Sequence, residues 1–214
     1  MGMKFAPDVD EFLMGVLTKG IIQIMDIIDE DTADYVQRAV LIARAAGSPP
    51  LKVLLNSGGG DLYASFFIHD VLSSYEGGTT AIVMGRAMSG ANLILQGCKT
   101  RLSTYGSTLF VHEMISHDKL NILRNKKKFQ EYLDDLIHWQ NKLYTVYQKR
   151  TGKSRAELRR IFEKEKVLSP EHALAYNFID QIVDPADLKL TSGGSKEIEL
   201  TPEQLEVLMG SATK

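Results

Sequence analysis

Two kinds of hydrophobic run alternate along the first half of the chain. Short runs dense in β-branched residues, Gly20 to Ile28 and Leu51 to Leu55, are typical of buried strands. Between them Val36, Val40 and Ala43 recur at helical spacing, after an acidic start and before Pro49-Pro50, which predicts a helix that ends there. The order β-α-β indicates an α/β fold.

The pattern repeats at Thr79 to Met84, a further predicted strand, and a helical run begins just after Ser89. Ser89 therefore stands at a strand-to-helix junction. The first amides of a helix lack intrahelical partners and carry partial positive charge, which stabilises negative charge beside them. A hydroxyl there is a candidate nucleophile; the alternative is that Ser89 only caps the helix.

A glycine-rich segment, Asn56-Ser57-Gly58-Gly59-Gly60, follows the strand that ends at Leu55, and a helix through Tyr75 comes next. Glycines at the carboxyl end of a strand let the backbone approach a ligand closely. A phosphate site is one interpretation, but no Gly-Lys-Ser/Thr follows and the dinucleotide fingerprint is incomplete. An extended peptide or an oxyanion fits these amides better.

His112 follows a predicted short strand, Thr108 to Val111, and Arg101-Leu102 marks another. A histidine at a strand end is often structural. Together with Ser89 and the glycine amides, however, it completes the set needed for acyl transfer: a nucleophile, a base and oxyanion donors.

The segment from Asp118 to Lys166 carries more than half of the chain's 25 Lys and Arg. Its apolar positions predict one long helix, a break at Thr151 to Ser154, and a shorter helix from Arg155. A basic helix can bind nucleic acid, but the formal net charge of −2 opposes this, and we expect a solvated helix that projects from the body. Ser169-Pro170 starts the next helix, Asn177 stops it, and Phe178 to Val183 is a last strand.

The composition bears on the compartment in which the protein resides. The single cysteine, Cys98, excludes an internal disulfide, lies in an apolar context and fits a reducing compartment. No secretory pattern opens the chain, and no run reaches the roughly 18 apolar residues of a membrane span. We expect a soluble cytoplasmic protein without a membrane or nucleic-acid partner.

These segments resemble the proteolytic subunit of the Clp protease family. Asn56 to Gly60 is similar to that family's Asn-Ser-Pro-Gly-Gly, Gly85 to Ala91 to its Gly-Gln-Ala-Ala-Ser-Met-Gly, and Phe110 to Glu113 to its Met-Ile-His-Gln. The segments at Thr151 to Ser154 and Leu168 to Tyr176 also match, so the resemblance runs from about residue 20 to 184 in the family's order.

The resemblance implies a ClpP/crotonase-like spiral of β-β-α units with a projecting helical handle. The peptidase domain would be 20–184, with the handle at about 113–150. Outside the resemblance, the residues themselves predict an N-terminal arm at 1–19 and a flexible linker with a short C-terminal helix at 185–214. The resemblance further implies a serine endopeptidase without metal or other cofactor, in heptameric rings fed with unfolded polypeptide by an ATP-dependent AAA+ unfoldase.

By the same resemblance Ser89 is the nucleophile, His112 the general base, and Gly59 and Gly90 the oxyanion donors. The family's third triad member is an aspartate, and Glu165 stands at its position. Gly58 replaces the family's proline, which loosens the loop. The segment from Glu113 to Lys119 lacks the family's glycine pair, so the rings are less strongly implied than the subunit fold.

Two alternatives remain at this stage. A crotonase-type acyl-CoA enzyme shares the spiral and a two-amide oxyanion hole, but it would use carboxylates as acid and base and needs a nucleotide pocket. A non-catalytic ClpP-like assembly subunit would keep the fold, with Glu165 as a sign of lost activity. The intact Ser89 and His112 favour the peptidase.

Overall fold

The computed structural model of the chain describes residues 19–113, 126–164, 167–188 and 190. Its strands are β1 (Ile21–Ile28), β2 (Leu51–Gly60), β3 (Thr79–Met88), β4 (Thr100–Thr104), β5 (Thr108–Phe110), β6 (Val167–Leu168) and β7 (Gln181–Val183). Its helices are α2 (Glu30–Ala45), α3 (Leu62–Ser73), α4 (Gly90–Gly97), α5 (Lys126–Thr151), α6 (Arg155–Lys164), α7 (Pro170–Ala175) and the 3₁₀ turn η2 (Pro185–Asp187). The predicted α/β class is confirmed.

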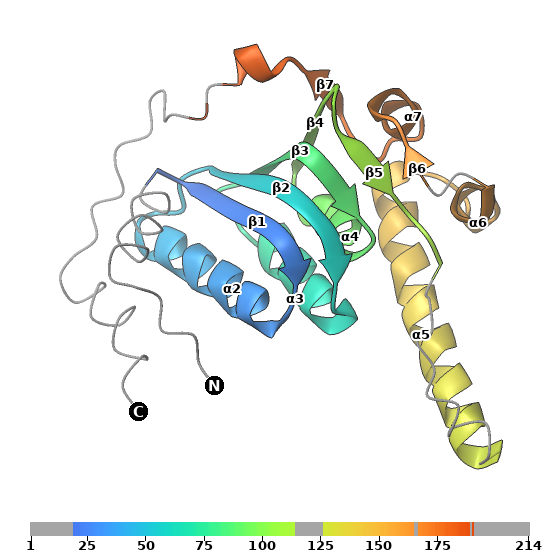
Figure 1. Cartoon of the computed structure of the whole chain (residues 1–214). Helices are drawn as coiled ribbons and strands as arrows, with labels where there is room; N and C mark the ends of the chain where they lie inside the picture. The colour runs from blue at the N-terminus through green and yellow to red at the C-terminus, as the bar shows by residue number, and fades with distance from the viewer. Residues whose placement is uncertain (1–18, 114–125, 165–166, 189, 191–214) are drawn as a thin grey trace, which may run out of the picture.

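The sheet is parallel except at one edge, with the order β1-β2-β3-β4-β7 (Figure 1). The two short strands expected near residues 101 and 108 do not pair with each other. Instead β4 pairs with the first half of β3, at residues 80–83, and β5 pairs with its second half, at residues 86–88. This succession carries β3 beyond the predicted end at Met84 and places the end of β5 beside the residue that follows β3.

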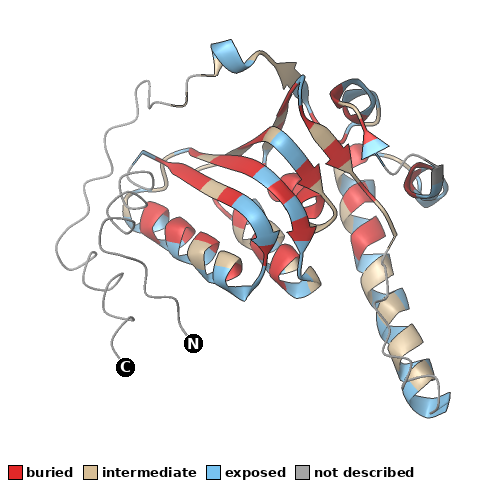
Figure 2. Cartoon of the chain, in the orientation of Figure 1, coloured by how far each residue is buried: buried red, intermediate tan, exposed pale blue. Residues whose placement is uncertain are grey.

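The main core lies between the sheet and helices α2, α3 and α4, which cover one face (Figures 1 and 2). The side chains of Ile22, Val53, Leu55 and Val83 are 0% exposed there. Their alternates along the strands, Ile21, Leu54 and Ile82, form a smaller apolar cluster separate from the main core. The two-residue period of the strands therefore divides their apolar residues between two clusters.

Strand β2 continues through the glycine-rich segment, which the sequence led us to expect as a loop after Leu55. Residues 57, 59 and 60 remain paired with β1 across a bulge next to Asp26, whose φ is 59°. A Cβ added to Gly60 would overlap the carbonyl of Ile28, so two backbones meet here with no space for a side chain. The glycines thus allow close packing of the strands, in addition to the ligand contact that the sequence suggested for them.

The predicted long helix, break and shorter helix are found as α5 and α6, with Gly152 at φ 72° in the turn between them. Residues 118–125 of that prediction lie outside the described residues. Helix α5 projects from the body as a handle, while its last turns are buried (Figures 1 and 2). At this base Tyr144 and Tyr147 pack on Phe162 of α6, with ring centroids 5.4 and 5.3 Å away.

The closing elements also form as expected. Ser169 caps α7 by accepting from the His172 amide, and Asn177 ends it in the left-handed region at φ 62°. The predicted strand from Phe178 is shorter and begins at Gln181. Of the predicted N-terminal arm only Lys19 is described, and of the predicted C-terminal linker and helix only residues 185–188 and 190, which include η2; Glu165 lies outside the described residues. Within the described part, no helix has the length and apolarity needed to cross a bilayer.

Candidate active site

Ser89 occupies a strained turn between β3 and α4. Its φ of 50° and ψ of −119° lie outside the regions that L-residues ordinarily adopt. The residue stands at the N-cap position, but its side chain makes no capping hydrogen bond. Ser89 therefore does not act as a side-chain cap of α4 in this structure. A sharp strand-to-helix turn of this kind is the geometry by which another fold exposes a nucleophilic serine.

The hydroxyl of Ser89 lies instead against His112. The Nε2 atom of His112 is 2.8 Å from Ser89 Oγ. Sheet pairing brings the two together, since Met88 is opposite Phe110 and the Ser89 amide donates to the Phe110 carbonyl at 2.9 Å. Residues 23 positions apart are thereby placed within hydrogen-bonding distance by one strand register.

The hydrogen bond at the other ring nitrogen of His112 indicates which nitrogen carries a proton. Nδ1 is hydrogen-bonded to the backbone carbonyl of Glu113. Because a carbonyl can only accept, this partner assigns the proton to Nδ1 and leaves Nε2 free to accept the proton of Ser89. In the neutral ring this tautomer presents Nε2 as the acceptor that a general base requires.

Backbone from β2 closes the other side of the turn. Gly59 has φ +94°, and a Cβ added there would lie 2.7 Å from the Met88 carbonyl and 2.9 Å from both Ser89 Cβ and the Gly90 nitrogen. Only glycine fits this contact. The structure therefore brings Gly59 and Gly90 together beside Ser89, as the two predicted oxyanion donors require.

The two amides differ in their present partners. The Gly59 amide donates to Ser57 Oγ at 3.0 Å, and Ser57 is 0% exposed. The Gly90 amide belongs to the first turn of α4, whose amides have no partner within the helix. Gly90 also allows α4 to pack on α3, because a Cβ there would overlap Ser65 Oγ. Sequence reasoning missed the role of Ser57, a hydrogen bond that no spacing predicts.

Glu165, the expected third triad member, lies outside the described residues. Among the residues that are described, none has a carboxylate hydrogen-bonded to His112, and the Glu113 carbonyl is the acceptor found at Nδ1. No sequence signal could have indicated this acceptor, since every residue carries a backbone carbonyl.

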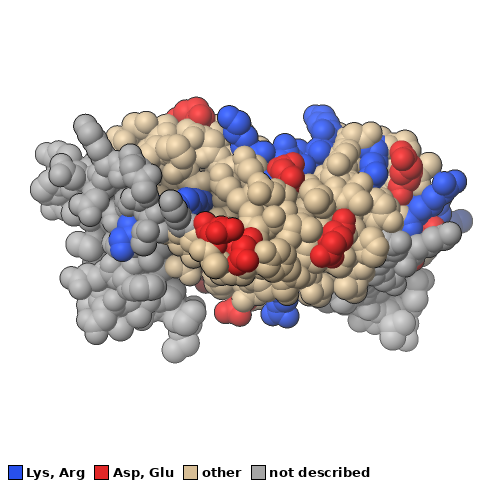
Figure 3. Space-filling model, turned by 90° about the horizontal axis from the view of Figure 1, so that it is seen from above, with Lys and Arg blue, Asp and Glu red and all other residues tan. Residues whose placement is uncertain are grey.

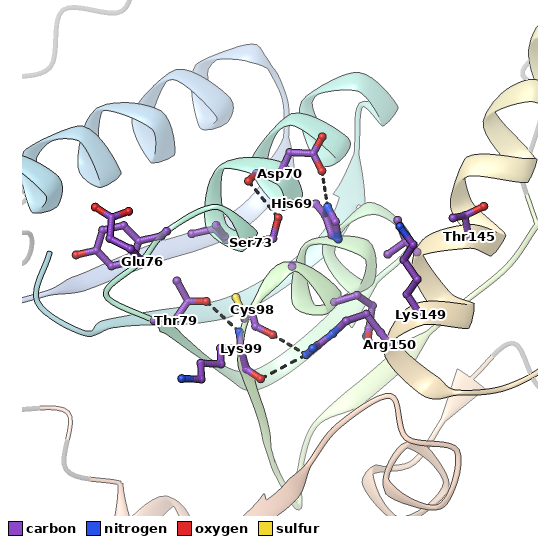
Figure 4. Close-up of a pocket in the computed structure, with 16 residues that line it drawn as sticks. His69, Asp70, Ser73, Glu76, Thr79, Cys98, Lys99, Thr145, Lys149 and Arg150 are labelled. Carbon is purple, nitrogen blue, oxygen red and sulfur yellow. Dashed lines mark hydrogen bonds and ion pairs between the residues drawn. The ribbon is translucent and has the colours of Figure 1, made fainter.

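A concavity of about 500 Å³ lies between the carboxyl ends of α3 and α4 and the last turns of α5 (Figure 4). At its wall Arg150 donates to the Cys98 carbonyl at 2.6 Å, so a cation from α5 binds the carboxyl end of α4. Burial raises the pKa of the Cys98 thiol to about 12, which keeps it protonated and unreactive. Cys98 is thus a buried structural residue, as its apolar context indicated.

The charged side chains on one face of the molecule, and the metal-ligating side chains of the described residues, indicate no further site. Basic and acidic residues are interspersed on the face shown in Figure 3, without a continuous basic surface of the kind that binds nucleic acid. Within the described ranges, no group of three or more His, Cys, Asp or Glu side chains is placed to hold a metal ion.

Comparison with known proteins identifies the family of the chain. The family model for Clp protease matches residues 7–186. An ATP-dependent Clp protease proteolytic subunit from Deinococcus radiodurans is 27% identical over 136 residues, which is 63% of this chain and 65% of that protein. Subunit 4 of the chloroplast enzyme of Arabidopsis thaliana is 24% identical over 176 residues, which is 80% of this chain and 59% of that protein. The chain thus spans under two thirds of the length of both relatives.

A solved structure supports the fold independently. A mutant of ClpP1 from Listeria monocytogenes superposes with a TM-score of 0.73, covering 82% of this chain and 98% of that chain at 17% sequence identity. The sheet with its projecting handle is therefore that of ClpP. The family model spans most of the described sheet, the Ser89 turn and the handle, and on this ground the chain belongs to the Clp protease family.

Proposed function

We propose that this protein is a serine endopeptidase that cleaves unfolded polypeptides inside an oligomeric chamber. One observation carries the proposal: His112 Nε2 lies 2.8 Å from the Oγ of Ser89, at a strained turn that leaves the hydroxyl free of any capping role. Membership of the Clp protease family supplies the substrate class.

In the proposed reaction Ser89 Oγ attacks the carbonyl carbon of a peptide bond as its proton passes to His112 Nε2. The oxyanion that forms accepts hydrogen bonds from the amides of Gly90 and Gly59. His112 then gives the proton to the leaving amine, and water hydrolyses the acyl-enzyme by the same route in reverse. A positioned base contributes roughly 10² to 10⁴ in rate, and one oxyanion donor roughly 10² to 10³.

The Gly59 amide must exchange one acceptor for another in this reaction. It now donates to Ser57 Oγ, so the oxyanion would replace or share that bond. Gly58 gives this stretch more freedom than the family's proline would. Glu165 would share the Nδ1 proton of His112 with the Glu113 carbonyl, and a carboxylate stabilises an imidazolium more than a neutral carbonyl does.

The relatives are named as proteolytic subunits of ATP-dependent proteases. From the resemblance to the family we infer for this chain an assembly in heptameric rings and a separate AAA+ unfoldase as the ATP-using partner.

The test is intact-mass analysis after treatment with a fluorophosphonate. Wild type should gain a single adduct, Ser89→Ala should gain none, and His112→Ala should react roughly 10² to 10⁴ times more slowly. Slower labelling of Glu165→Ala would give that residue the orienting role. Cleavage of an unfolded protein substrate by wild type, but not by Ser89→Ala, would extend the result from an activated serine to a peptidase.

One observation favours a second function, that of a non-catalytic assembly subunit. The Gly59 amide is already bonded to Ser57 Oγ, so it is not free to receive an oxyanion. Such a subunit would stay unlabelled when folded and assembled, and a mixed complex would keep its activity when it carries Ser89→Ala.

A further inference from the structure

The residue after His112 is held by the handle. The hydroxyl of Tyr144, near the base of α5, donates to Glu113 Oε1 at 2.6 Å. Glu113 is in turn the residue whose backbone carbonyl accepts from His112 Nδ1. One residue thus joins the handle to the imidazole, through its side chain on one side and its main chain on the other.

We propose that Tyr144 is a positioning residue, which sets the orientation and tautomer of His112 by anchoring Glu113. The role rests on the function proposed above, because it matters only if His112 acts as a base. It assigns a part in the reaction to the handle, an element that contributes neither the serine, the histidine nor the oxyanion amides.

The ring of Tyr144 is held in place by packing. Tyr144 is 2% exposed, and its ring is stacked on Phe162 with centroids 5.4 Å apart and planes at 17°. The Arg155 guanidinium lies 4.5 Å from the centroid of the same ring. Aromatic stacking and a cation over the ring hold the phenol without help from its hydroxyl. The hydroxyl is therefore available for Glu113, and removing it leaves the packing in place.

The hydrogen bond keeps its direction across the working pH range. Burial raises the pKa of Tyr144 well above its ordinary value, and the bond to Glu113 raises it further. The phenol therefore remains protonated and donates, and the carboxylate accepts. A charge-assisted bond of this kind is about twice as strong as a bond between neutral groups.

The need for an anchor follows from the position of Glu113. Within the described residues, β5 ends at Phe110, and the hydrogen bonds found at the His112 and Glu113 side chains are those to Ser89, to the Glu113 carbonyl and to Tyr144. The carbonyl of Glu113 points at Nδ1, and loss of that bond frees the imidazole to rotate and to exchange tautomers. Tyr144 restrains Glu113 from a second element of the fold.

The deciding experiment compares two buried tyrosines three residues apart on α5. Tyr144→Phe removes the hydroxyl that meets Glu113. Tyr147→Phe removes one that meets Asn92 at 3.1 Å, from a ring that also contacts Phe162. We expect Tyr144→Phe to lower the rate constant of fluorophosphonate labelling about tenfold, a fraction of the 10² to 10⁴ that a whole base is worth. Tyr147→Phe should stay within about twofold of wild type, because the hydroxyl that it removes is bonded to Asn92 and to neither Glu113 nor His112.

A double-mutant cycle separates positioning from general loosening. In a His112→Ala background, Tyr144→Phe should cause no further loss, because the group it positions is gone. Glu113→Ala should reproduce the loss, and Glu113→Gln, which keeps an acceptor oxygen, should restore most of the rate. These Glu113 variants leave the packing of the handle intact and decide the question should Tyr144→Phe fold poorly.

The outcomes are distinct. Equal labelling of Tyr144→Phe and Tyr147→Phe, in a wild type that does label, overturns the positioning role and leaves the proposed function standing. A loss that persists in the His112→Ala background also overturns it. A folded, assembled wild type that does not label overturns the proposed function, and the positioning role with it.

Discussion

The two halves of the candidate active site are built in different ways. On the nucleophile side, Ser89, Gly59 and Gly90 are held by backbone: strand register, positive φ and contacts too close for any side chain. On the base side, His112 stands beyond the end of β5, its Nδ1 meets the Glu113 carbonyl, and the Glu113 side chain is bonded to Tyr144 of the handle. The comparison teaches that the nucleophile is placed by backbone pairing between strands, whereas the base also has side-chain contacts behind it.

The largest effect should come from the backbone of the nucleophile side. Gly59→Ala would force a Cβ against the Met88 carbonyl at 2.7 Å, at a φ of +94° that alanine rarely adopts. We expect the fluorophosphonate labelling rate to fall roughly 10² to 10³-fold, the worth of one oxyanion donor.

Gly106→Ala is the matched control for this change, because a Cβ at Gly106 meets nothing within 4 Å. It should label like wild type. Full labelling of Gly59→Ala would mean that the turn does not depend on the contact with β2, and the contrast between the two sides would fail.

The next effect concerns the packing behind the nucleophile helix. Arg101 is 4% exposed and reaches both carboxylate oxygens of Asp180, at 2.6 and 3.2 Å, and the side chain of Gln96 at 2.6 Å. Arg101→Met would fill similar volume but leave these oxygens without their donor. We expect unfolding in urea to become easier by about 2 to 3 kcal/mol, less than for a fully buried pair because Asp180 is partly exposed.

Arg38→Met supplies the comparison for Arg101. Arg38 pairs with Asp34 on the surface of α2, with 46% and 52% of the two side chains exposed, and should change stability by under about 1 kcal/mol. Equal losses in the two variants would show that Arg101 acts only as a surface charge.

The same division explains what the sequence predicted. Strands β1 to β5 and β7, the α-helices, and the grouping of Ser89, Gly59, Gly90 and His112 followed from periodicity, caps and matched motifs, all of which are local signals, whereas the two-residue strand β6 was not predicted. The Glu113 carbonyl at His112 Nδ1 and the Tyr144 hydroxyl at Glu113 could not be predicted. They join residues by tertiary packing, which leaves no pattern in one sequence.

The boundaries that moved have a common physical reason. Strands β2 and β3 run past Leu55 and Met84 because neighbouring strands β1 and β5 continue to pair with them. Pairing of this kind is a property of the sheet, whereas the prediction rested on the residues of one strand. A glycine run reads as a loop in isolation and becomes a strand when a partner backbone lies close by.

A smaller effect should show that the middle of the handle and its base contribute differently, the middle to helix stability and the base to the orientation of His112. Trp139 of α5 packs against Tyr63 and Phe66 of α3, with ring centroids 4.8 and 5.2 Å away. Trp139→Ala removes both contacts, each worth about 0.5 to 1.5 kcal/mol. We expect hydrogen exchange to become faster along residues 126–143, while the labelling rate stays close to that of wild type because Tyr144 still holds Glu113.

Tyr144→Phe is the converse case for that measurement, with slower labelling and little change in exchange along residues 126–143. If Trp139→Ala slowed labelling as much as Tyr144→Phe, the orientation of His112 would depend on the whole handle rather than on the single anchor at its base.

The smallest effect is a dependence of stability on acid, carried by Asp180. Burial alone would raise the pKa of this carboxyl, but the hydrogen bonds and charge of Arg101 outweigh burial and hold the pKa below its ordinary value of 3.8. A lowered folded-state pKa adds stability that is complete above pH 3.8 and is lost as the pH falls through the folded-state value.

The urea midpoint of wild type should therefore exceed that of Asp180→Asn at pH 6, and the gap should narrow below pH 3.8. Because 39% of the side chain is exposed, solvent screens the pair and this pH-linked part should stay below about 1 kcal/mol. A gap that persists unchanged into acid would mean that Asp180 stabilises the fold as a hydrogen-bond acceptor alone, and that the nucleophile side gains nothing from the charge of its carboxylate.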